Sequence, residues 1–336
     1  MCKLKKYISQ TQCQIKSFKI QIKIFVIIIS VLLLSCDYNK NKESKNAINY
    51  IDVKFDRFEK KFFNSSLDSL SKLIDEYPFL FSKRFSLDEW KAIKTDSTRK
   101  EIFNKTDSVF KNFKSVENGV KKIFTNTKNF FPNFKSPKLI TLNNGIDYKY
   151  KIIDSDSLIL ISLDCYLGEN IFYNNIPAHI SKLMVPEFVT IDISELISSR
   201  YVEIPLDRKF ISKIIYHGKL LFLMKEVSGI DPLKALGFNK NNKDWMIENE
   251  NNVWKYFVEN DLLFSTQSSL DYRFLANAPF SKFGLSIDFE SPPMVGRWIG
   301  YQIVKSYSKK NKSNLNDLLN QDNYELYLKS NYKPNK

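Results

Sequence analysis

Apolar residues recur every three or four positions between residues 67 and 129, which is the period of amphipathic helices. Pro78 interrupts the pattern and ends the first predicted helix. The apolar positions that carry this period are Leu67, Leu70, Leu73, Ile74, Phe103, Val109, Phe110, Phe113, Val120 and Phe124. Before them, apolar and polar residues alternate over residues 51–55, which predicts a short strand leading into a helix at residues 58–63.

The pattern changes after residue 135. Short runs rich in Ile and aromatic residues, separated by Asn-Asn-Gly and Asp-Ser-Asp turns, predict a small antiparallel sheet from Leu139–Leu142, Tyr148–Ile153 and Leu158–Leu163. Helical periods then return, with one helix starting near Pro186 and another ending at Gly229. We therefore predict an α+β fold, mainly helical with a small antiparallel sheet.

An apolar run near the N-terminus stops abruptly at a cysteine. The run Ile24–Leu34 contains eleven residues and is broken only by Ser30. A helix of that length covers roughly 16 Å, about half of a ~30 Å hydrocarbon core. Six lysines and no acidic residue accompany the run within residues 1–35. These features favour a signal peptide over a membrane-spanning helix.

The residues Leu33-Leu34-Ser35-Cys36 resemble a bacterial lipobox, in which a small residue precedes the cysteine that becomes acylated. We predict a lipoprotein signal peptide over residues 1–35, lipidation of Cys36 and a flexible, polar tether over residues 36–48. A folded domain follows over residues 49–336, with a helical N-terminal lobe to about residue 135 and a sheet with further helices over 136–336. An ordinary signal peptide with an incidental cysteine is the alternative.

Composition changes the picture once the leader is removed. Without residues 1–35 the formal net charge falls from +14 to +8, carried largely by scattered lysines. No arginine-rich cluster is present, so a nucleic acid partner is not expected. Cys165 then has no second cysteine besides Cys36, and we expect it to behave as a small buried apolar residue without a disulfide.

Candidate chemistry is sparse. The chain has two histidines, His179 and His217, and no HExxH, Walker A, GxSxG or CxxC motif. Asp164 and Glu169 flank the end of a predicted strand and could form an acid–base pair, although carboxylates at strand ends are common. Ser194-Glu195-Leu196-Ile197-Ser198 keeps the glutamate of HExxH and has serines where the zinc-binding histidines would stand.

Five blocks in order resemble the gliding-motility lipoprotein GldB family of the Bacteroidota. These blocks are ISLDCYLGENIFY, FISKIIYHGKLLFLMKEV, NENNVWKYFVENDLLFSTQ, APFSKFGLSID and GRWIGYQIVKSY. The resemblance covers nearly all of the chain after Cys36. It implies a role in gliding motility, in an envelope whose gliding machinery is linked to type IX protein secretion, and it implies no reaction.

That family looks distantly like predicted zinc peptidases. The resemblance implies a degenerate zincin-like scaffold in which Ser194 and Ser198 replace the HExxH ligands and His217 replaces a ligand glutamate next to Gly218. Serine hydroxyls bind Zn²⁺ poorly at neutral pH, so we expect neither a metal nor another cofactor. These four positions, Ser194, Glu195, Ser198 and His217, are candidates for a vestigial site without catalytic residues.

We therefore predict a non-enzymatic lipoprotein that is held to a membrane through Cys36, faces the periplasm and binds envelope proteins of the gliding machinery. Two alternatives stay open: a zinc-peptidase-like hydrolase that uses Glu195, and a module that binds cell-wall polymer. Trp245, Trp254 and Trp298 are either core anchors or aromatic contacts for a partner.

Overall fold

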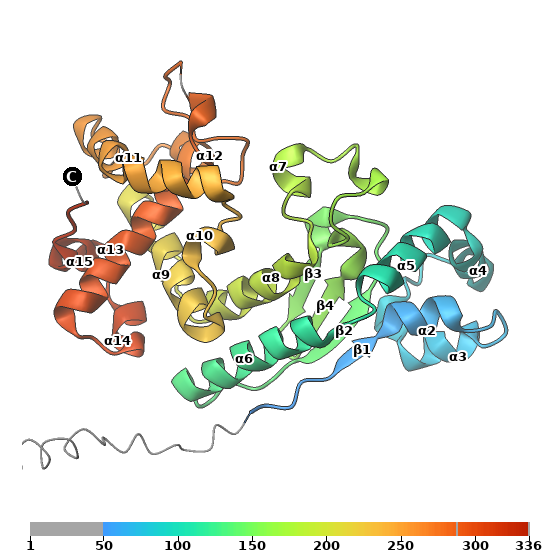
Figure 1. Cartoon of the computed structure of the whole chain (residues 1–336). Coiled ribbons are helices and arrows are strands. Elements are labelled where there is room, and N and C mark those ends of the chain that lie inside the picture. Colours follow the sequence, from blue (N-terminus) through green and yellow to red (C-terminus); the bar gives the residue numbers. More distant parts are fainter. Residues whose placement is uncertain (1–49, 287, 335–336) are drawn as a thin grey trace, which may run out of the picture. The chain divides into compact units, whose positions relative to one another are not determined.

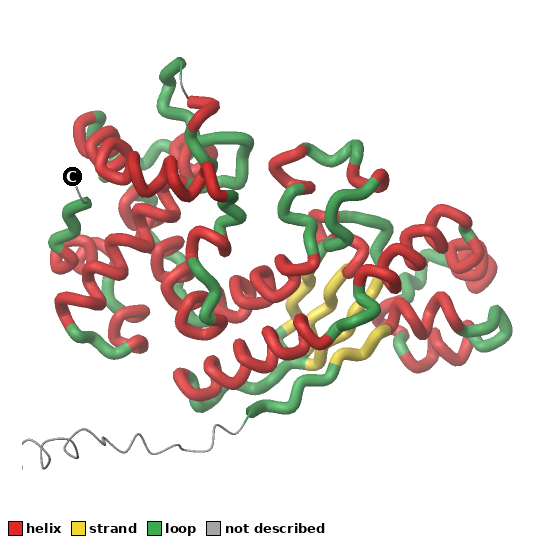
Figure 2. Tube along the Cα trace, viewed as in Figure 1, coloured by secondary structure: helices red, strands yellow, loops and turns green. Residues whose placement is uncertain are grey.

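Four short strands form a mixed sheet, with the strand order β1-β2-β4-β3. The computed structural model describes residues 50–286 and 288–334, so the predicted signal peptide, Cys36 and the whole predicted tether lie outside the described residues. Figure 2 shows the strands in yellow, side by side among helices. The strands are β1 (Phe55–Arg57), β2 (Lys138–Leu142), β3 (Ile152–Ser155) and β4 (Leu158–Ser162).

Helices make up most of the remaining chain, which confirms the predicted α+β class with a dominant helical part (Figure 1). The α-helices are α2 (Phe58–Asn64), α3 (Leu70–Glu76), α4 (Leu87–Thr95), α5 (Ser97–Val109), α6 (Lys114–Phe130), α7 (Ala178–Ser181), α8 (Pro186–Ser199), α9 (Phe210–Ser228), α10 (Pro232–Ala235), α11 (Lys240–Glu259), α12 (Ser269–Phe274), α13 (Val295–Asn311), α14 (Leu315–Asn320) and α15 (Asn323–Ser330).

The predicted antiparallel sheet is correct for the pairing of β3 with β4 and wrong for β2, and the first strand, which was not predicted to belong to this sheet, joins it. β3 and β4 form the antiparallel hairpin expected from the Asp-Ser-Asp turn, where Asp156 adopts a left-handed backbone with φ of 44°. β1 pairs with β2 in parallel, and β2 pairs with β4 in parallel. Helices α2–α6 lie between β1 and β2 in the chain and supply the crossover that parallel strands require.

The sheet separates two hydrophobic cores because successive side chains of a strand point to opposite faces. Leu139 of β2 and its partner Ile159 of β4 belong to the larger core. Ile140, one residue along β2, belongs to a smaller core on the other face, and its partner Leu160 packs there as well. The buried members of the smaller core are Phe58, Phe62, Leu70, Leu73, Tyr77, Phe81 and Ile140.

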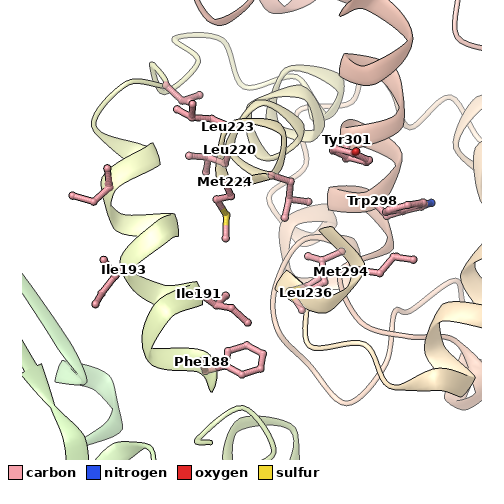
Figure 3. Packing of buried hydrophobic residues seen from close by; sticks show 14 of the residues in the cluster. Phe188, Ile191, Ile193, Leu220, Leu223, Met224, Leu236, Met294, Trp298 and Tyr301 are labelled. Atoms are coloured by element: carbon pink, nitrogen blue, oxygen red, sulfur yellow. The ribbon is translucent and has the colours of Figure 1, made fainter. Parts of the chain in front are cut away.

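Helix α9 runs through the larger core and is apolar on nearly every side. It contacts α6, α8, α10, α13 and α15, which leaves little of its surface for water. Figure 3 shows α9 between α8 and α13, with Leu220, Leu223 and Met224 among side chains from the neighbouring helices. Gly229 ends the helix in a left-handed conformation with φ of 72°, as the sequence predicts.

The three tryptophans considered as core anchors or partner contacts all pack in or against the larger core. Trp298 is buried, and its ring nitrogen donates to Glu250 at 2.9 Å. Trp245 and Trp254 are half-buried against the larger core. Among residues 50–286 and 288–334, none of the helices has both the length and the apolar character that crossing a bilayer demands.

Candidate functional site

Two glycines let helices α9 and α13 touch backbone to backbone. A Cβ atom placed on Gly218 of α9 would collide with the backbone carbonyl of Gly300 in α13. A Cβ atom placed on Gly300 would collide with the carbonyl oxygen of Ile214. His217 precedes Gly218 in α9, and Arg297 lies about one turn before Gly300 in α13. The close approach of the two helices therefore places His217 and Arg297 beside the same pocket.

A pocket of about 220 Å³ lies where α8, α9, α10 and α13 meet. Its apolar wall consists of Leu183, Phe188, Leu220, Leu221, Met224, Ala235, Leu236 and Met294. The polar side chains that line it are Lys151, Asp192, Glu195, His217, Asn277 and Arg297. A small hollow with an apolar wall and several convergent polar groups is the usual form of a ligand site, so we treat it as the candidate functional site and call it the central pocket.

Arg297 contacts both the backbone and a carboxylate on the polar side of the central pocket. Its Nε donates to the backbone oxygen of Leu275 at 2.6 Å, and its Nη1 lies 3.6 Å from Oε1 of Glu195. Burial lowers the pKa of the guanidinium, yet an arginine remains protonated at neutral pH. Glu195 therefore faces a fixed positive charge, while its side chain keeps 45% of its surface exposed.

His217 is neutral at pH 7. Burial, together with the positive charge of Arg297, lowers the pKa of the imidazole to about 3. A neutral imidazole offers one donor and one acceptor nitrogen, so it can hydrogen-bond a ligand but does not supply charge. The ring of Tyr216 lies 5.2 Å from the imidazole, measured between the ring centroids.

The predicted vestigial residues do not all reach the same place. Glu195 and His217 line the central pocket. Ser194 and Ser198 are fully buried and do not line it: Ser194 Oγ donates to the backbone oxygen of Met224 at 3.5 Å. Ser198 Oγ has no hydrogen-bond partner among the described residues. The structure thus separates the two serines from the glutamate between them.

Sequence reasoning missed an ion pair at one edge of the central pocket. Lys151 Nζ lies 2.5 Å from Oδ2 of Asp192, and the Tyr166 hydroxyl donates to the same oxygen at 2.7 Å. Burial and the charge of Asp192 raise the pKa of Tyr166 well above its ordinary value, which keeps that hydroxyl a donor. Asp192 stands three residues before Glu195, and this i,i+3 spacing on one helix face was the available signal.

Asn277 is a further pocket residue without a signal in the sequence. Its Nδ2 donates to the backbone oxygen of His179 at 3.1 Å, which fixes the amide. Its Oδ1 is buried and accepts no hydrogen bond within the part of the chain that the structure describes. A buried amide oxygen without a donor is costly, so it is a point where a ligand's N–H or O–H group would be bound.

Asp164 and Glu169, the other carboxylates considered, do not form a site. Asp164 is fully buried and accepts hydrogen bonds from the backbone N–H groups of Asn144, Gly145 and Ile146 at 3.2, 2.8 and 2.8 Å. Glu169 is exposed to solvent. Asp164 therefore holds the loop after β2 in place.

No group of three or more His, Cys, Asp and Glu side chains converges as a metal site within residues 50–286 and 288–334. The polar groups that line the central pocket are a guanidinium, a neutral imidazole, carboxylates, an amide and an amine. These groups suit the recognition of a polar or anionic group attached to a small apolar body.

The fold and the pocket define a mainly helical α+β protein with a small mixed sheet. A family model described as gliding motility protein GldB matches residues 38–334, and the chain belongs to this family. A membrane-anchored lipoprotein of the cell envelope fits that membership. Comparisons with curated proteins and with solved structures each gave no match.

Proposed function

We propose that this chain is a non-enzymatic envelope lipoprotein that acts as an accessory or scaffold of the gliding and type IX secretion machinery. Acyl chains on Cys36 would hold it to a membrane, with the folded domain in the periplasm. One observation carries the proposal: the gliding motility family model matches nearly the whole chain after Cys36, over residues 38–334. Two or three acyl chains are sufficient for stable anchoring.

The geometry of the central pocket supports a role without catalysis. The Arg297 guanidinium lies 3.6 Å from Glu195, the residue that would act as general base in a zinc peptidase. A fixed positive charge so close repels a divalent cation. The hydroxyls of Ser194 and Ser198 are buried away from the pocket, so they are not offered as ligands.

A degenerate zincin-like scaffold forms part of the proposal. Glu195 from α8 and His217 from α9 line one pocket, as the resemblance to zinc peptidases implies, whereas the buried Ser194 and Ser198 do not line it. In this interpretation Ser194, Ser198 and His217 stand at the positions of former metal ligands. The scaffold would have been kept for its shape and its binding surface.

A hydrolase is the second candidate, and the central pocket is the observation that favours it. A neutral imidazole and a carboxylate in one hollow are groups that general acid–base catalysis uses. Metal analysis of the purified full chain separates the two functions. We expect no stoichiometric zinc. One zinc per chain, with a peptidase activity that chelation abolishes, would favour the hydrolase.

Genetics and labelling test the primary proposal. We expect a strain without this gene to lose colony spreading and the wild-type gene to restore it. Labelled palmitate should enter the wild-type protein, whereas Cys36→Ala should take up none and should not restore spreading. Normal spreading of the deletion strain would overturn the proposed role.

The third possibility, binding of cell-wall polymer, predicts co-sedimentation of the purified protein with isolated peptidoglycan.

A further inference from the structure

A second hollow adjoins the central pocket and opens to solvent. It has a volume of about 640 Å³ and shares His217 and Arg297 with the central pocket. Residues of α9, of α12 and of the loop between α8 and α9 form its walls. We call it the α9–α12 groove and define it by Ile204, Leu206, Arg208, Tyr272, Leu275 and Arg297.

Large apolar side chains are displayed at this groove. Ile204 is 74% exposed, Leu206 is fully exposed and Tyr272 is 56% exposed. Pro205 stands between the two aliphatic residues and fixes its own φ, which restricts the loop that presents them. An exposed aliphatic side chain gains free energy when a partner removes it from water. Apolar residues gathered beside a groove are typical of a site that a partner covers.

The acidic residues of the groove are already engaged, whereas one cation is not. Both carboxylate oxygens of Asp271 bind Lys213 Nζ, at 2.9 and 2.7 Å. Asp207 accepts from Ser212 Oγ and from the backbone N–H of Lys209, both at 2.8 Å. Arg208 is exposed and forms no ion pair within residues 50–286 and 288–334.

Further positive charge lies beside the apolar residues. Lys282 Nζ lies 4.4 Å from the centroid of the Tyr272 ring and donates to the Tyr272 hydroxyl at 3.1 Å. Arg297 lies at the junction with the central pocket. The carboxylate that offsets its charge is that of Glu195, whose Oε1 lies 3.6 Å from Arg297 Nη1. Three cations, Arg208, Lys213 and Arg297, and two carboxylates, Asp207 and Asp271, line the groove. Its surface is therefore apolar with a small excess of positive charge, and its complement is apolar and anionic.

We propose that the α9–α12 groove binds an extended segment of a partner protein that carries an acidic side chain next to a large apolar one. The apolar side chain packs on Ile204, Leu206 and Tyr272, and the carboxylate pairs with Arg208. The carboxylates of Asp207 and Asp271 have further acceptor capacity for the backbone N–H groups of such a segment. The inference rests on the proposed accessory function and names the chemistry of the partner.

Two fluorescent octapeptides test this assignment, one of alternating leucine and glutamate and the other of alternating leucine and lysine. The full chain, purified in detergent, is titrated with each, and binding is followed by fluorescence anisotropy. We expect the glutamate peptide to bind about tenfold more tightly, because hydrogen bonds to charged groups contribute about 1.5–3 kcal/mol. Arg208→Glu and Leu206→Asp should each weaken its binding about tenfold.

The matched control is Ile247→Asp, since Ile247 is 63% exposed on α11 and lies outside the groove. This variant should bind the glutamate peptide as the wild type does. Equal affinity for the two peptides, absence of binding, or insensitivity to both groove variants would overturn the proposal. So would a dimer in sedimentation that Leu206→Asp dissociates, or binding to phosphatidylglycerol vesicles that requires Arg208.

Colony spreading distinguishes a failure of this inference from a failure of the proposed function. If the deletion strain spreads normally, the accessory function fails whatever the peptides do. If that strain does not spread and the octapeptides show no preference, only the assignment of the groove fails.

Discussion

The two hydrophobic cores on either side of the sheet are built on different principles. Aromatic ring contacts fill the smaller core, such as Phe58–Phe81 at 5.8 Å and Phe81–Trp90 at 5.0 Å between centroids, and the buried ammonium group of Lys94 beside them donates to the backbone oxygen of Phe62. The larger core includes a helix crossing through Gly218 and Gly300 and encloses charged groups. The packing of the larger core is interrupted at Arg297, which lines both the central pocket and the α9–α12 groove.

This difference between the two cores indicates that a binding site is to be sought in the larger one. A core that is filled by aromatic side chains, with its buried ammonium group already bonded to the backbone, stabilises the fold and leaves little for a ligand to bind. A core that holds a guanidinium, a neutral imidazole and an unsatisfied amide carries polar groups at a cost in stability. Such a cost is typical of binding sites.

The largest loss of stability is expected from a substitution at the contact between α9 and α13 in the larger core. Gly300→Ala should lower the free energy of unfolding by about 4 kcal/mol or more, because the added methyl group meets backbone atoms that cannot rotate away. Urea denaturation of the purified protein measures this. The control is Gly119→Ala in α6, where the added atom meets only the side chain of Thr190. Equal stability of the two variants would contradict the backbone contact.

A slightly smaller effect is expected in the smaller core. Phe62→Ala should cost about 3 kcal/mol, since the truncation leaves a cavity among Phe58, Phe81 and Trp90. Hydrogen exchange should rise in α2 to α4 and stay low in α9, on the opposite side of the sheet. A uniform rise over both regions would show that the two cores do not act as separate units.

The larger core should also respond to pH through Lys219. Its Nζ donates to the backbone oxygens of Leu319 and Gln321 at 3.0 and 2.6 Å, and burial lowers its pKa from 10.5 to about 8. The unfolded chain therefore binds this proton more tightly, and stability rises with pH between about 8 and 10.5.

The comparison variant is Lys219→Met, which removes the titrating group. The free energy of unfolding of the wild type, relative to this variant, should increase by up to about 3 kcal/mol across that pH range, because one pKa unit corresponds to about 1.4 kcal/mol. Denaturation at several pH values measures the difference. Two parallel stability curves would show that the buried amine does not titrate there.

Local structure was predictable because its signals are local. Pro186 begins α8, and Gly229 ends α9 in the left-handed conformation that favours glycine. The Asp-Ser-Asp turn correctly predicted the hairpin of β3 and β4. The parallel pairings were missed, since the strands involved are not neighbours in the chain and runs of Ile do not specify a partner.

The candidate site was predictable only in part. The degenerate motif and the His217-Gly218 pair pointed to Glu195 and His217, and both line the central pocket. Arg297 was not expected there, because its position follows from the contact of Gly218 with Gly300, which joins residues 82 positions apart. The burial of Ser194 and Ser198 also depends on which face of α8 meets α9.

Colony spreading of a Glu195→Gln strain tests the central claim of a role without catalysis most directly. The amide keeps the size of the side chain and its contact with Arg297 while removing the only base of the degenerate motif. At wild-type protein levels, we expect spreading at the wild-type rate. Loss of spreading by a variant that accumulates, folds and carries its lipid normally would contradict the claim.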